Sequence, residues 1–458
     1  MADSLIQISD LNSALWGIEI FDPARNQSVY SHNAGRHFIP ASNTKIVVTT
    51  VAMGSLGPDY RYRTDILTSS PREDGGPERV IVVGKGDPTW SARYHPTHFT
   101  VLEQLADSLV HKGIRSVTKE LIIDASFFGS ERVNSTWEVG DLPYSSAPPS
   151  GAFIMGEGTL DLEVLPGTRA GDAAIVRAIG PQGIFPIRAV VTTDTARGSA
   201  SLTLDYHAWP DTIALSGRIG LGQPDTMTIA APNATRLAAA AFADALARKG
   251  IQVAALRIVY DSTEAATLRA AITDTVTSWA SEPMSTIVAG ILQPSQNWIA
   301  EQVLRTMGGI QRGRGTWSAG LDVERRFLID VVGLDSMSFL LRDASGLSAQ
   351  NLLSPQALVR LLEYNRLAAW GSLYRSALPT PGLRGSTLSN RLEGLEGKVF
   401  AKTGTISNVA SLCGYIVTRS GRELTFSIMV NASGRASSQA RRAIDRLVAA
   451  LADARDWE

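Results

Sequence analysis

The residues with the clearest chemical potential are a serine and a lysine three positions apart, Ser42 and Lys45, followed by an apolar run over 46–53. Residues i and i+3 are neighbours on a helix, so the Ser42 hydroxyl comes within reach of the Lys45 amine. At a helix N-terminus, free N–H groups and the dipole also favour negative charge. The pair therefore suits nucleophilic acyl transfer. A helix cap followed by a solvated lysine is the alternative, because Ser-x-x-Lys alone is common.

Two further motifs follow in the chain. Ser295 and Asn297 flank Gln296 after a proline and present a hydroxyl and an amide from a short loop. Lys402-Thr403-Gly404 lies in a β-prone run, where glycine lets a ligand backbone approach the strand. Alone, Ser295 and Asn297 are typical of a helix cap. The ordered set Ser-x-x-Lys, Ser-x-Asn and Lys-Thr-Gly is the signature of serine β-lactamases and penicillin-binding proteins.

The chemistry predicts a role for each catalytic candidate. Ser42 is a poor nucleophile without a base, and Lys45 can be that base only when it is neutral. Burial beside another cation such as Lys402 would lower the pKa of Lys45. Ser295 can relay a proton to the leaving amine, while Asn297 can orient Lys45 and the substrate amide.

The strand that carries Lys402 is the predicted substrate-binding element. Lys402 with Thr403 and Thr405 can bind a free carboxylate on the substrate. The backbone N–H groups of Ser42 and Thr405 would form an oxyanion hole. The predicted substrate-binding residues of this stretch are Thr403, Gly404, Thr405 and Ile406.

These residues require a particular set of elements to position them. A hairpin of strands over 15–20 and 28–30 is predicted to feed the Ser42 helix, which ends near residue 54. Helices over 284–292 and 298–307 flank the Ser295 loop, and strands over 399–405, 411–418 and 423–430 form a meander. Residues 69–77 read as an exposed loop. The remaining predicted strands are 60–68, 79–83, 121–124, 173–179, 187–192 and 200–204, and the remaining helices are 102–111, 235–248, 355–365 and 440–454.

Bulk composition limits the function classes. The chain has 458 residues, 44% of them hydrophobic and 19% charged, which is typical of a globular protein of two or three domains. A formal net charge of −1 gives no electrostatic case for nucleic acid. Cys413 is the sole cysteine, so no intramolecular disulfide forms. No apolar run is long enough for a membrane span, and we expect no metal and no organic cofactor.

The whole chain resembles the DacB-type class C low-molecular-mass penicillin-binding proteins, which are D-alanyl-D-alanine carboxypeptidase/endopeptidases. About 250 residues separate Lys45 from Ser295, where simpler relatives need well under half that. The pieces that carry the resemblance are Pro40 to Lys45, Leu56 to Tyr60, Gly86 to Thr89, Ser295 to Asn297 with Glu301, Asp343 to Ser348 with Asn351 to Pro355, and Ala401 to Thr405.

The resemblance implies an α/β (α+β) fold. A serine β-lactamase/transpeptidase-like domain would be built from 1–62 and 276–458. A large, mainly β, two-domain region would be inserted in it, with domain II from 63–85 and 155–275 and a nested domain III from 86–154.

The resemblance also implies a loop that contacts the side chain of the peptidoglycan stem peptide. By position this loop carries Trp137, Asp141 and Tyr144, and Asp141 matches the acidic residue that meets the amino group of a diaminopimelate side chain. An ordinary surface aspartate is the alternative. Where the family commonly has an arginine after Gly-Leu-Ser, this chain has Ala349, so the preferred side chain stays open.

The implied activity is a serine D-Ala-D-Ala carboxypeptidase or peptidoglycan DD-endopeptidase, working through an acyl-enzyme on Ser42 and acylated by β-lactams. Its partners would be peptidoglycan stem peptides, with β-lactam antibiotics as covalent inhibitors. We expect a periplasmic or extracytoplasmic location, although the N-terminus shows no export signal. The alternatives are a β-lactamase or esterase on the same scaffold, and a catalytically silent peptidoglycan-binding protein.

Overall fold

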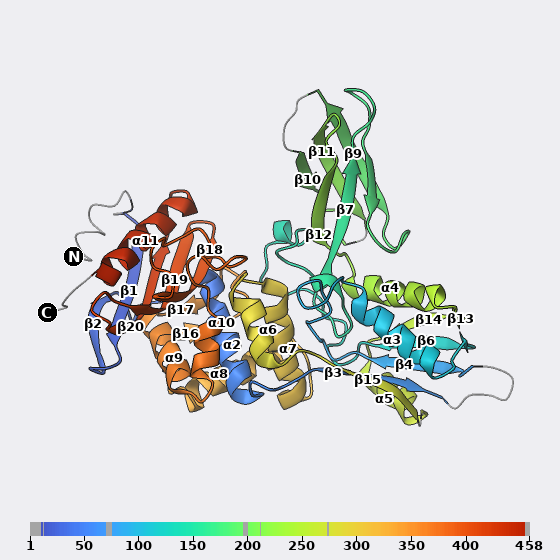
Figure 1. Cartoon of the computed structure of the whole chain (residues 1–458), viewed down its shortest axis with the longest axis horizontal. Coiled ribbons are helices and arrows are strands. Elements are labelled where there is room, and N and C mark those ends of the chain that lie inside the picture. Colours follow the sequence, from blue (N-terminus) through green and yellow to red (C-terminus); the bar gives the residue numbers. More distant parts are fainter. Residues whose placement is uncertain are drawn as a thin grey trace. The chain divides into compact units, whose positions relative to one another are not determined.

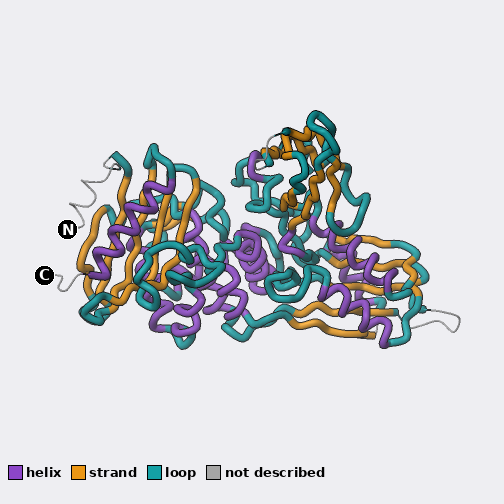
Figure 2. Tube along the Cα trace, turned by 45° about the horizontal axis from the view of Figure 1, so that its top comes forward, coloured by secondary structure: helices purple, strands orange, loops and turns teal. Residues whose placement is uncertain are grey.

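The computed structural model describes residues 11, 13–69, 76–195, 200–210, 212–272 and 274–453. The chain divides into two compact units. Unit 1 contains Met1–Tyr60, Pro283–Gly313 and Trp317–Glu458, and unit 2 contains Arg61–Glu282 and Arg314–Thr316. Helices and strands occur in both units (Figure 2), which confirms the predicted α/β class. The N-terminal residues read for an export signal, and residues 70–75 of the predicted exposed loop, lie outside the described residues.

Unit 1 is built on a five-stranded antiparallel sheet that joins the two ends of the chain. The strand order is β18-β19-β20-β1-β2, and Figure 1 shows blue β1 beside red β20. The register pairs Ile18 with Ile428. The bounds are β1 Leu15–Asp22, β2 Gln27–His32, β18 Val399–Ile406, β19 Val409–Val417 and β20 Glu423–Asn431.

Helices cover both faces of this sheet, so its central strands are buried on both sides. On one face α11 (Ser437–Asp453) buries Ile444, Leu447 and Val448 in a cluster with sheet residues such as Phe426 and Ile428. On the other face α9 (Pro355–Leu367) contacts β20 and β1. Ser354 caps α9 by accepting from the Ala357 N–H, and Pro355 occupies its first turn.

Helix α2 (Lys45–Ser55) is the central helix of this second layer. All residues from Lys45 to Met53 are buried, as expected of a helix that is packed on every side. It contacts α6 (Met284–Leu292), α7 (Asn297–Arg312), α8 (Trp317–Asp330) and α9. The short 3₁₀ turn η1 (Ala41–Thr44) precedes it. Helix α10 (Gly371–Ala377) and the two-residue strands β16 (Phe339–Leu340) and β17 (Leu352–Leu353) complete the unit.

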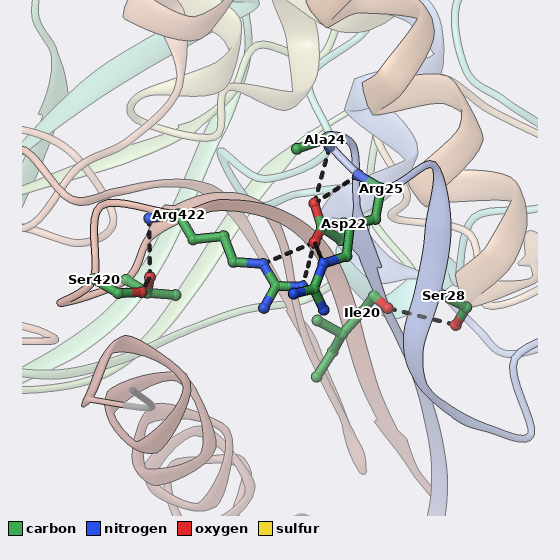
Figure 3. Close-up of polar contacts among 8 residues, drawn as sticks. Ile20, Asp22, Ala24, Arg25, Ser28, Ser420 and Arg422 are labelled. Carbon is green, nitrogen blue, oxygen red and sulfur yellow. Dashed lines mark hydrogen bonds and ion pairs between the residues drawn. The ribbon is translucent and has the colours of Figure 1, made fainter. Parts of the chain in front are cut away.

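An ion pair between buried Asp22 and half-buried Arg422 joins two turns at one end of the unit 1 sheet (Figure 3). The Asp22 side chain is fully buried, and its carboxylate accepts from Nε of Arg422 at 2.7 Å and also from Nη2. The same carboxylate accepts from the Ala24 N–H at 2.9 Å and the Arg25 N–H at 3.3 Å. Asp22 therefore ties the β1–β2 turn to the turn between β19 and β20.

Unit 2 contains a mixed five-stranded sheet in the order β14-β6-β4-β3-β15. The β4–β6 and β6–β14 pairs are parallel, and the β3–β4 and β3–β15 pairs are antiparallel. Helix α4 (Ala234–Arg248) contacts α3 (Thr100–His111) and β14, and α5 (Ser262–Ala270) also contacts β14. The strands are β3 Arg63–Thr68, β4 Arg79–Val83, β6 Glu120–Asp124, β14 Leu256–Val259 and β15 Asp274–Ala280.

The remaining strands of unit 2 form smaller sheets. Two three-stranded sheets have the orders β12-β7-β8 and β10-β11-β9, and the pair β5 (Ser116–Val117) and β13 (Gln252–Val253) is parallel. Two short 3₁₀ turns are η2 Val139–Asp141 and η3 Gly156–Gly158. The strands are β7 Thr159–Leu165, β8 Ile175–Ala178, β9 Ile187–Asp194, β10 Ser201–Leu204, β11 Ile213–Gly220 and β12 Asp225–Ala230.

The division of the insertion into two domains stays a prediction, and the sheets favour other boundaries than those predicted. Strand β6 falls in the predicted nested domain 86–154, yet it pairs with β4 and β14 from the predicted domain II. The two three-stranded sheets are instead built entirely from residues 159–230.

Candidate active site

The η1 turn places Ser42 where solvent can reach it, directly before α2. Ser42 is half-buried, whereas Lys45 is fully buried. Ala41 adopts a left-handed backbone with φ of 48°, a conformation that costs a non-glycine residue about 1–3 kcal/mol. Surrounding contacts must hold the turn in this conformation.

Residues from β19 and β20 supply those contacts. The Asn431 side chain accepts from the Ile39 N–H at 2.7 Å and donates to the Ile39 carbonyl at 3.1 Å. The Ser411 hydroxyl donates to the Pro40 carbonyl at 2.7 Å. The sheet therefore fixes the two residues that lead into the Ser42 turn.

The Lys45 amine is the centre of the site. Its Nζ donates to Ser42 Oγ at 2.8 Å, to Asn297 Oδ1 at 2.7 Å and to the Ser345 carbonyl at 2.5 Å. The structure therefore brings the predicted nucleophile, base and orienting amide together within unit 1. The third partner, the carbonyl of Ser345, has no signal in the predicted motifs.

Burial lowers the pKa of Lys45 to about 7, while Asp343 and Glu301 act in the opposite direction by favouring the ammonium form. Burial also lowers the pKa of Lys402 well below its ordinary value, and Lys45 adds to this shift. Desolvation is thus the main cause for both lysines, as the predicted burial implied, whereas the neighbouring cation named in that prediction is not among the causes for Lys45.

Ser295 and Lys402 form a second pair. Lys402 Nζ donates to Ser295 Oγ at 2.8 Å and to the Thr403 carbonyl at 2.7 Å. Ser295 has a left-handed backbone with φ of 65°, in the loop between α6 and α7. Gln296, rather than Ser295 or Asn297, caps α7, because its side chain accepts from the Trp298 N–H. The helix-cap alternative for Ser295 and Asn297 therefore fails.

Strand β18 runs directly alongside the η1 turn. A Cβ on Gly404 would lie 2.6 Å from the Pro40 carbonyl oxygen and 3.1 Å from the Ser42 nitrogen. Gly404 thus makes room for the turn that carries Ser42, in addition to the predicted room for a ligand backbone. The Thr403 hydroxyl donates to Thr387 Oγ1 at 2.8 Å.

The outer end of β18 is the accessible part of the predicted substrate strand. Thr405 is exposed and Ile406 half-buried, whereas Lys402, Thr403 and Gly404 are buried. The Thr405 hydroxyl donates to the Gly404 carbonyl at 2.8 Å.

Two buried acids, Glu301 and Asp343, act on the Lys45 amine, and a third, Glu324, is buried near these acids. Glu301 and Asp343 stand in the stretches that carry the family resemblance, but no role was predicted for them. Burial and Asp343 raise the pKa of Glu301 to about 7. Glu324 is also buried, and burial, Glu301 and Asp343 raise its pKa well above the ordinary value. Nothing in the local sequence around Glu301 or Glu324 indicates that these glutamate side chains are buried.

The predicted side-chain-binding residues belong to unit 2. Trp137 is buried, and Asp141 and Tyr144 are half-buried around η2. Burial raises the pKa of Asp141, and Glu138 adds to the shift. Tyr144 forms an isolated β-bridge with Ile229. Their role in substrate binding stays a prediction.

Among the described residues no group of three or more His, Cys, Asp or Glu side chains is arranged to hold a metal ion. No helix in the same part of the chain has the length and apolar character needed to cross a membrane.

The D-Ala-D-Ala carboxypeptidase 3 (S13) family matches residues 1–451 of this chain. A D-alanyl-D-alanine carboxypeptidase of Actinomadura sp. (strain R39) is 30% identical over 447 residues, covering 94% of this chain and 80% of the relative. The Haemophilus influenzae carboxypeptidase DacB is 23% identical, covering 92% and 86%. The crystal structure of penicillin binding protein 4 (dacB) from Haemophilus influenzae has a TM-score of 0.83, 20% identity and 99% coverage of both chains. Its complex with a β-lactam has a TM-score of 0.79 at 19% identity and 99% coverage of both chains.

The fold and the site define a serine-type DD-peptidase with a transpeptidase-like catalytic unit. The chain belongs to the D-Ala-D-Ala carboxypeptidase 3 (S13) family. The predicted family, fold class and enzyme class are confirmed.

Proposed function

We propose that this enzyme cleaves peptides ending in D-Ala-D-Ala, and related peptidoglycan cross-links, through an ester on Ser42. The observation that carries this proposal is the contact between Ser42 Oγ and a fully buried Lys45 amine at 2.8 Å. Because the pKa of Lys45 is about 7, a large share of the amine is neutral near neutral pH and can accept the hydroxyl proton.

The proposed reaction has two halves. Ser42 Oγ attacks the carbonyl carbon of the penultimate D-Ala while Lys45 takes the hydroxyl proton. The C–N bond breaks, and the Ser295 hydroxyl, held by Lys402, passes a proton to the leaving amine. The proton that Lys45 accepted from Ser42 then replaces it on Ser295, so both the Lys45 amine and the Ser295 hydroxyl are restored. Water then attacks the ester, which releases the shortened peptide and regenerates the Ser42 hydroxyl.

Strand β18 provides most of the residues that we assign to substrate binding. We assign Lys402, Thr403 and Thr405 to the terminal carboxylate of the substrate, and Gly404 and Ile406 to the surface that its backbone follows. An anion beside Lys402 favours the ammonium form, so substrate binding raises the pKa of Lys402. The N–H groups of Ser42 and Thr405 serve as the oxyanion hole. The approach of Gly404 to Ser42 supports this pairing.

We assign peptidoglycan stem peptides as substrates and β-lactams as covalent inhibitors, and place the enzyme outside the cytoplasmic membrane, where that polymer lies. The solved β-lactam complex of the Haemophilus influenzae relative supports the inhibitor class. We also assign Trp137, Asp141 and Tyr144 to the stem-peptide side chain. Asp141→Asn should reduce kcat/KM about tenfold for diaminopimelate peptides and leave peptides with a neutral side chain unchanged.

The test is product analysis with synthetic pentapeptides ending in D-Ala-D-Ala and with purified cross-linked muropeptide dimers. D-alanine release from the first indicates carboxypeptidase action, and monomer formation from the second indicates endopeptidase action. Ser42→Ala should abolish both, whereas Ser420→Ala, an exposed serine of the same unit, should retain both. Rapid β-lactam hydrolysis without peptide cleavage would indicate a β-lactamase. No reaction with either class would indicate a silent binding protein.

A further inference from the structure

The side chain of Glu301 anchors a segment of backbone that touches the Lys45 amine. Glu301 is fully buried on α7, and its carboxylate accepts three N–H groups. Trp317 Nε1 donates at 2.7 Å, the Ser345 N–H at 2.8 Å and the Ala344 N–H at 3.1 Å. The carbonyl of the same Ser345 accepts from Lys45 Nζ. Ser345 thus connects the Glu301 carboxylate to the Lys45 amine, through its N–H on one side and its carbonyl on the other.

Asp343 fixes the other end of this segment. Its carboxylate accepts from the Gly346 N–H at 2.8 Å, the Ser348 N–H at 2.7 Å and Asn351 Nδ2 at 2.7 Å. Gly346 has a left-handed backbone with φ of 78°, and a Cβ there would overlap with the Ala41 carbonyl. Residues 344–346 therefore contact the carboxylates of Glu301 and Asp343 as well as Lys45 and the turn that carries Ser42.

We propose that Glu301 is a positioning residue for the base: by holding the backbone of residues 344–345, it directs the Ser345 carbonyl at Lys45 and supplies a buried negative charge to the amine. The carbonyl orients the Lys45 lone pair toward Ser42 when the amine is neutral. The charge of Glu301 keeps the amine from losing its proton too readily. This inference rests on the proposed role of Lys45 as the base.

The charged groups around Lys45 determine whether the loss of the Glu301 charge raises or lowers the pKa of Lys45. Lys402 on β18 is the other lysine at the site, and Asp343 and Glu301 are the acids that favour the ammonium form of Lys45. Arg305 on α7 stacks on Trp317 at 4.3 Å, beside Glu301. The pKa of Glu301 is itself raised to about 7, so its charge is present in part at neutral pH and in full above it. Removing that charge lowers the pKa of Lys45.

Glu324 on α8 provides a matched control. It is buried beside the same acids, yet within the described residues nothing donates a hydrogen bond to either of its carboxyl oxygens. Such a carboxyl group is neutral, since an unpaired buried charge is too costly. Glu324→Gln replaces one neutral group with another of the same size.

The experiment compares Glu301→Gln with Glu324→Gln in the full-length protein. The first readout is the titration midpoint of Lys45, from NMR of protein with ¹³C-labelled lysine, with the resonance assigned by Lys45→Arg. The second is the second-order rate constant for acylation by a fluorescent penicillin as a function of pH. Glu301→Gln should lower the Lys45 midpoint by about one unit, move the rising limb of the acylation profile the same way and reduce its plateau about tenfold.

Glu324→Gln should leave the midpoint and the profile at wild-type values. Trp317→Phe, which removes one donor from Glu301 and keeps a ring, should shift both in the direction of Glu301→Gln by a smaller amount. It also serves if Glu301→Gln does not fold. The proposal is overturned if the Lys45 midpoint stays at the wild-type value in Glu301→Gln and Trp317→Phe, or if Glu324→Gln shifts it equally. A wild-type protein that is not acylated would refute the proposed function, while the NMR midpoint would still decide the role of Glu301.

Discussion

Two fully buried lysines in one site are the central chemical feature of this protein. An isolated buried ammonium is costly, so such a group either finds anionic partners or loses its proton. Both effects act on Lys45: burial lowers its pKa, and the nearby acids Asp343 and Glu301 favour its ammonium form. Lys402 has a hydroxyl and a carbonyl as its hydrogen-bond acceptors and no carboxylate among them. We therefore propose that a substrate carboxylate would favour the ammonium form of Lys402.

The first prediction concerns pH. If neutral Lys45 is the base, acylation is slow below the Lys45 pKa, rises as pH passes through about 7 and reaches a plateau above it. The sign follows because burial lowers this pKa from that of a free lysine, which moves the neutral form into the neutral pH range. Rates with a single penicillin from about pH 5 to about pH 9 measure the profile. A flat profile would be incompatible with Lys45 as the base.

The second prediction concerns the substrate carboxylate. Amidation of the C-terminus of the peptide should lower wild-type kcat/KM by about 10–100-fold, since a hydrogen bond to a charged group contributes about 1.5–3 kcal/mol. In Lys402→Met the free acid and the amide should react at similar, low rates. Kinetics with the four combinations isolate the interaction. A Lys402→Met enzyme that still prefers the free acid would show that another group binds it.

At the scale of elements, the site depends on a strand that packs against a turn. Gly404→Ala should reduce acylation at least tenfold, because its Cβ would push β18 away from Pro40 and Ser42. Gly35→Ala is the control, since a Cβ there has nothing within 4 Å. Acylation rates and thermal midpoints of both variants measure the effect. An active Gly404→Ala enzyme would show that the approach of β18 to the turn is unimportant.

The catalytic elements were largely predictable, because each carries a local signal. The predicted strands over 399–405, 411–418 and 423–430 correspond to β18–β20, and the predicted helix over 284–292 has the observed bounds of α6. Helix α8 was not predicted, although it supplies Trp317 and Glu324. Charged residues interrupt its apolar pattern, and Glu324 is buried by tertiary packing that no local periodicity records.

The supporting contacts of the site were the least predictable part. Asn431 and Ser411 hold the segment before Ser42 from strands almost 400 residues away in the chain. Glu301 and Asp343 act on the Ser345 backbone, whose carbonyl has no side-chain signature. The three motifs name groups that react, while these partners are set by the fold.

At the scale of the molecule, the sheet of the catalytic unit combines strands from the N-terminal and C-terminal parts of the chain. Strands β1 and β20 pair over seven residue positions, and the ion pair of Asp22 with Arg422 joins the neighbouring turns (Figure 3). The chain leaves this unit after Tyr60 and returns to it before Met284. These two points are adjacent, because the Met284 N–H donates to the Tyr60 carbonyl at 2.8 Å. Residues 61–282 can thus form a separate unit without interrupting the catalytic sheet.

The Asp22 ion pair gives a prediction about stability. The pKa of Asp22 is lowered in the folded protein, where burial acts against the Arg422 and backbone hydrogen bonds but does not outweigh them. Its contribution is therefore full above the unfolded pKa of about 3.9 and is lost as pH falls through the lower folded value.

Asp22→Asn should reduce the free energy of unfolding by about 3 kcal/mol at neutral pH, because Arg422 loses its partner. The deficit should shrink as pH falls below the unfolded pKa, because the wild-type protein then loses the stabilisation that the ionised carboxylate provides. Denaturant unfolding of both proteins near pH 7 and near pH 3 measures it. The same deficit at both pH values would show that the charge of Asp22 is not what stabilises the turns.

The measurement that tests the central claim most directly is the site and lifetime of a penicillin adduct. Intact protein is incubated with a labelled penicillin, digested and mapped by mass spectrometry, with Ser42→Ala as the control. We predict one slowly released adduct on Ser42 and none in the variant. An adduct on another residue, or its persistence in Ser42→Ala, would contradict the assignment of Ser42 as the nucleophile.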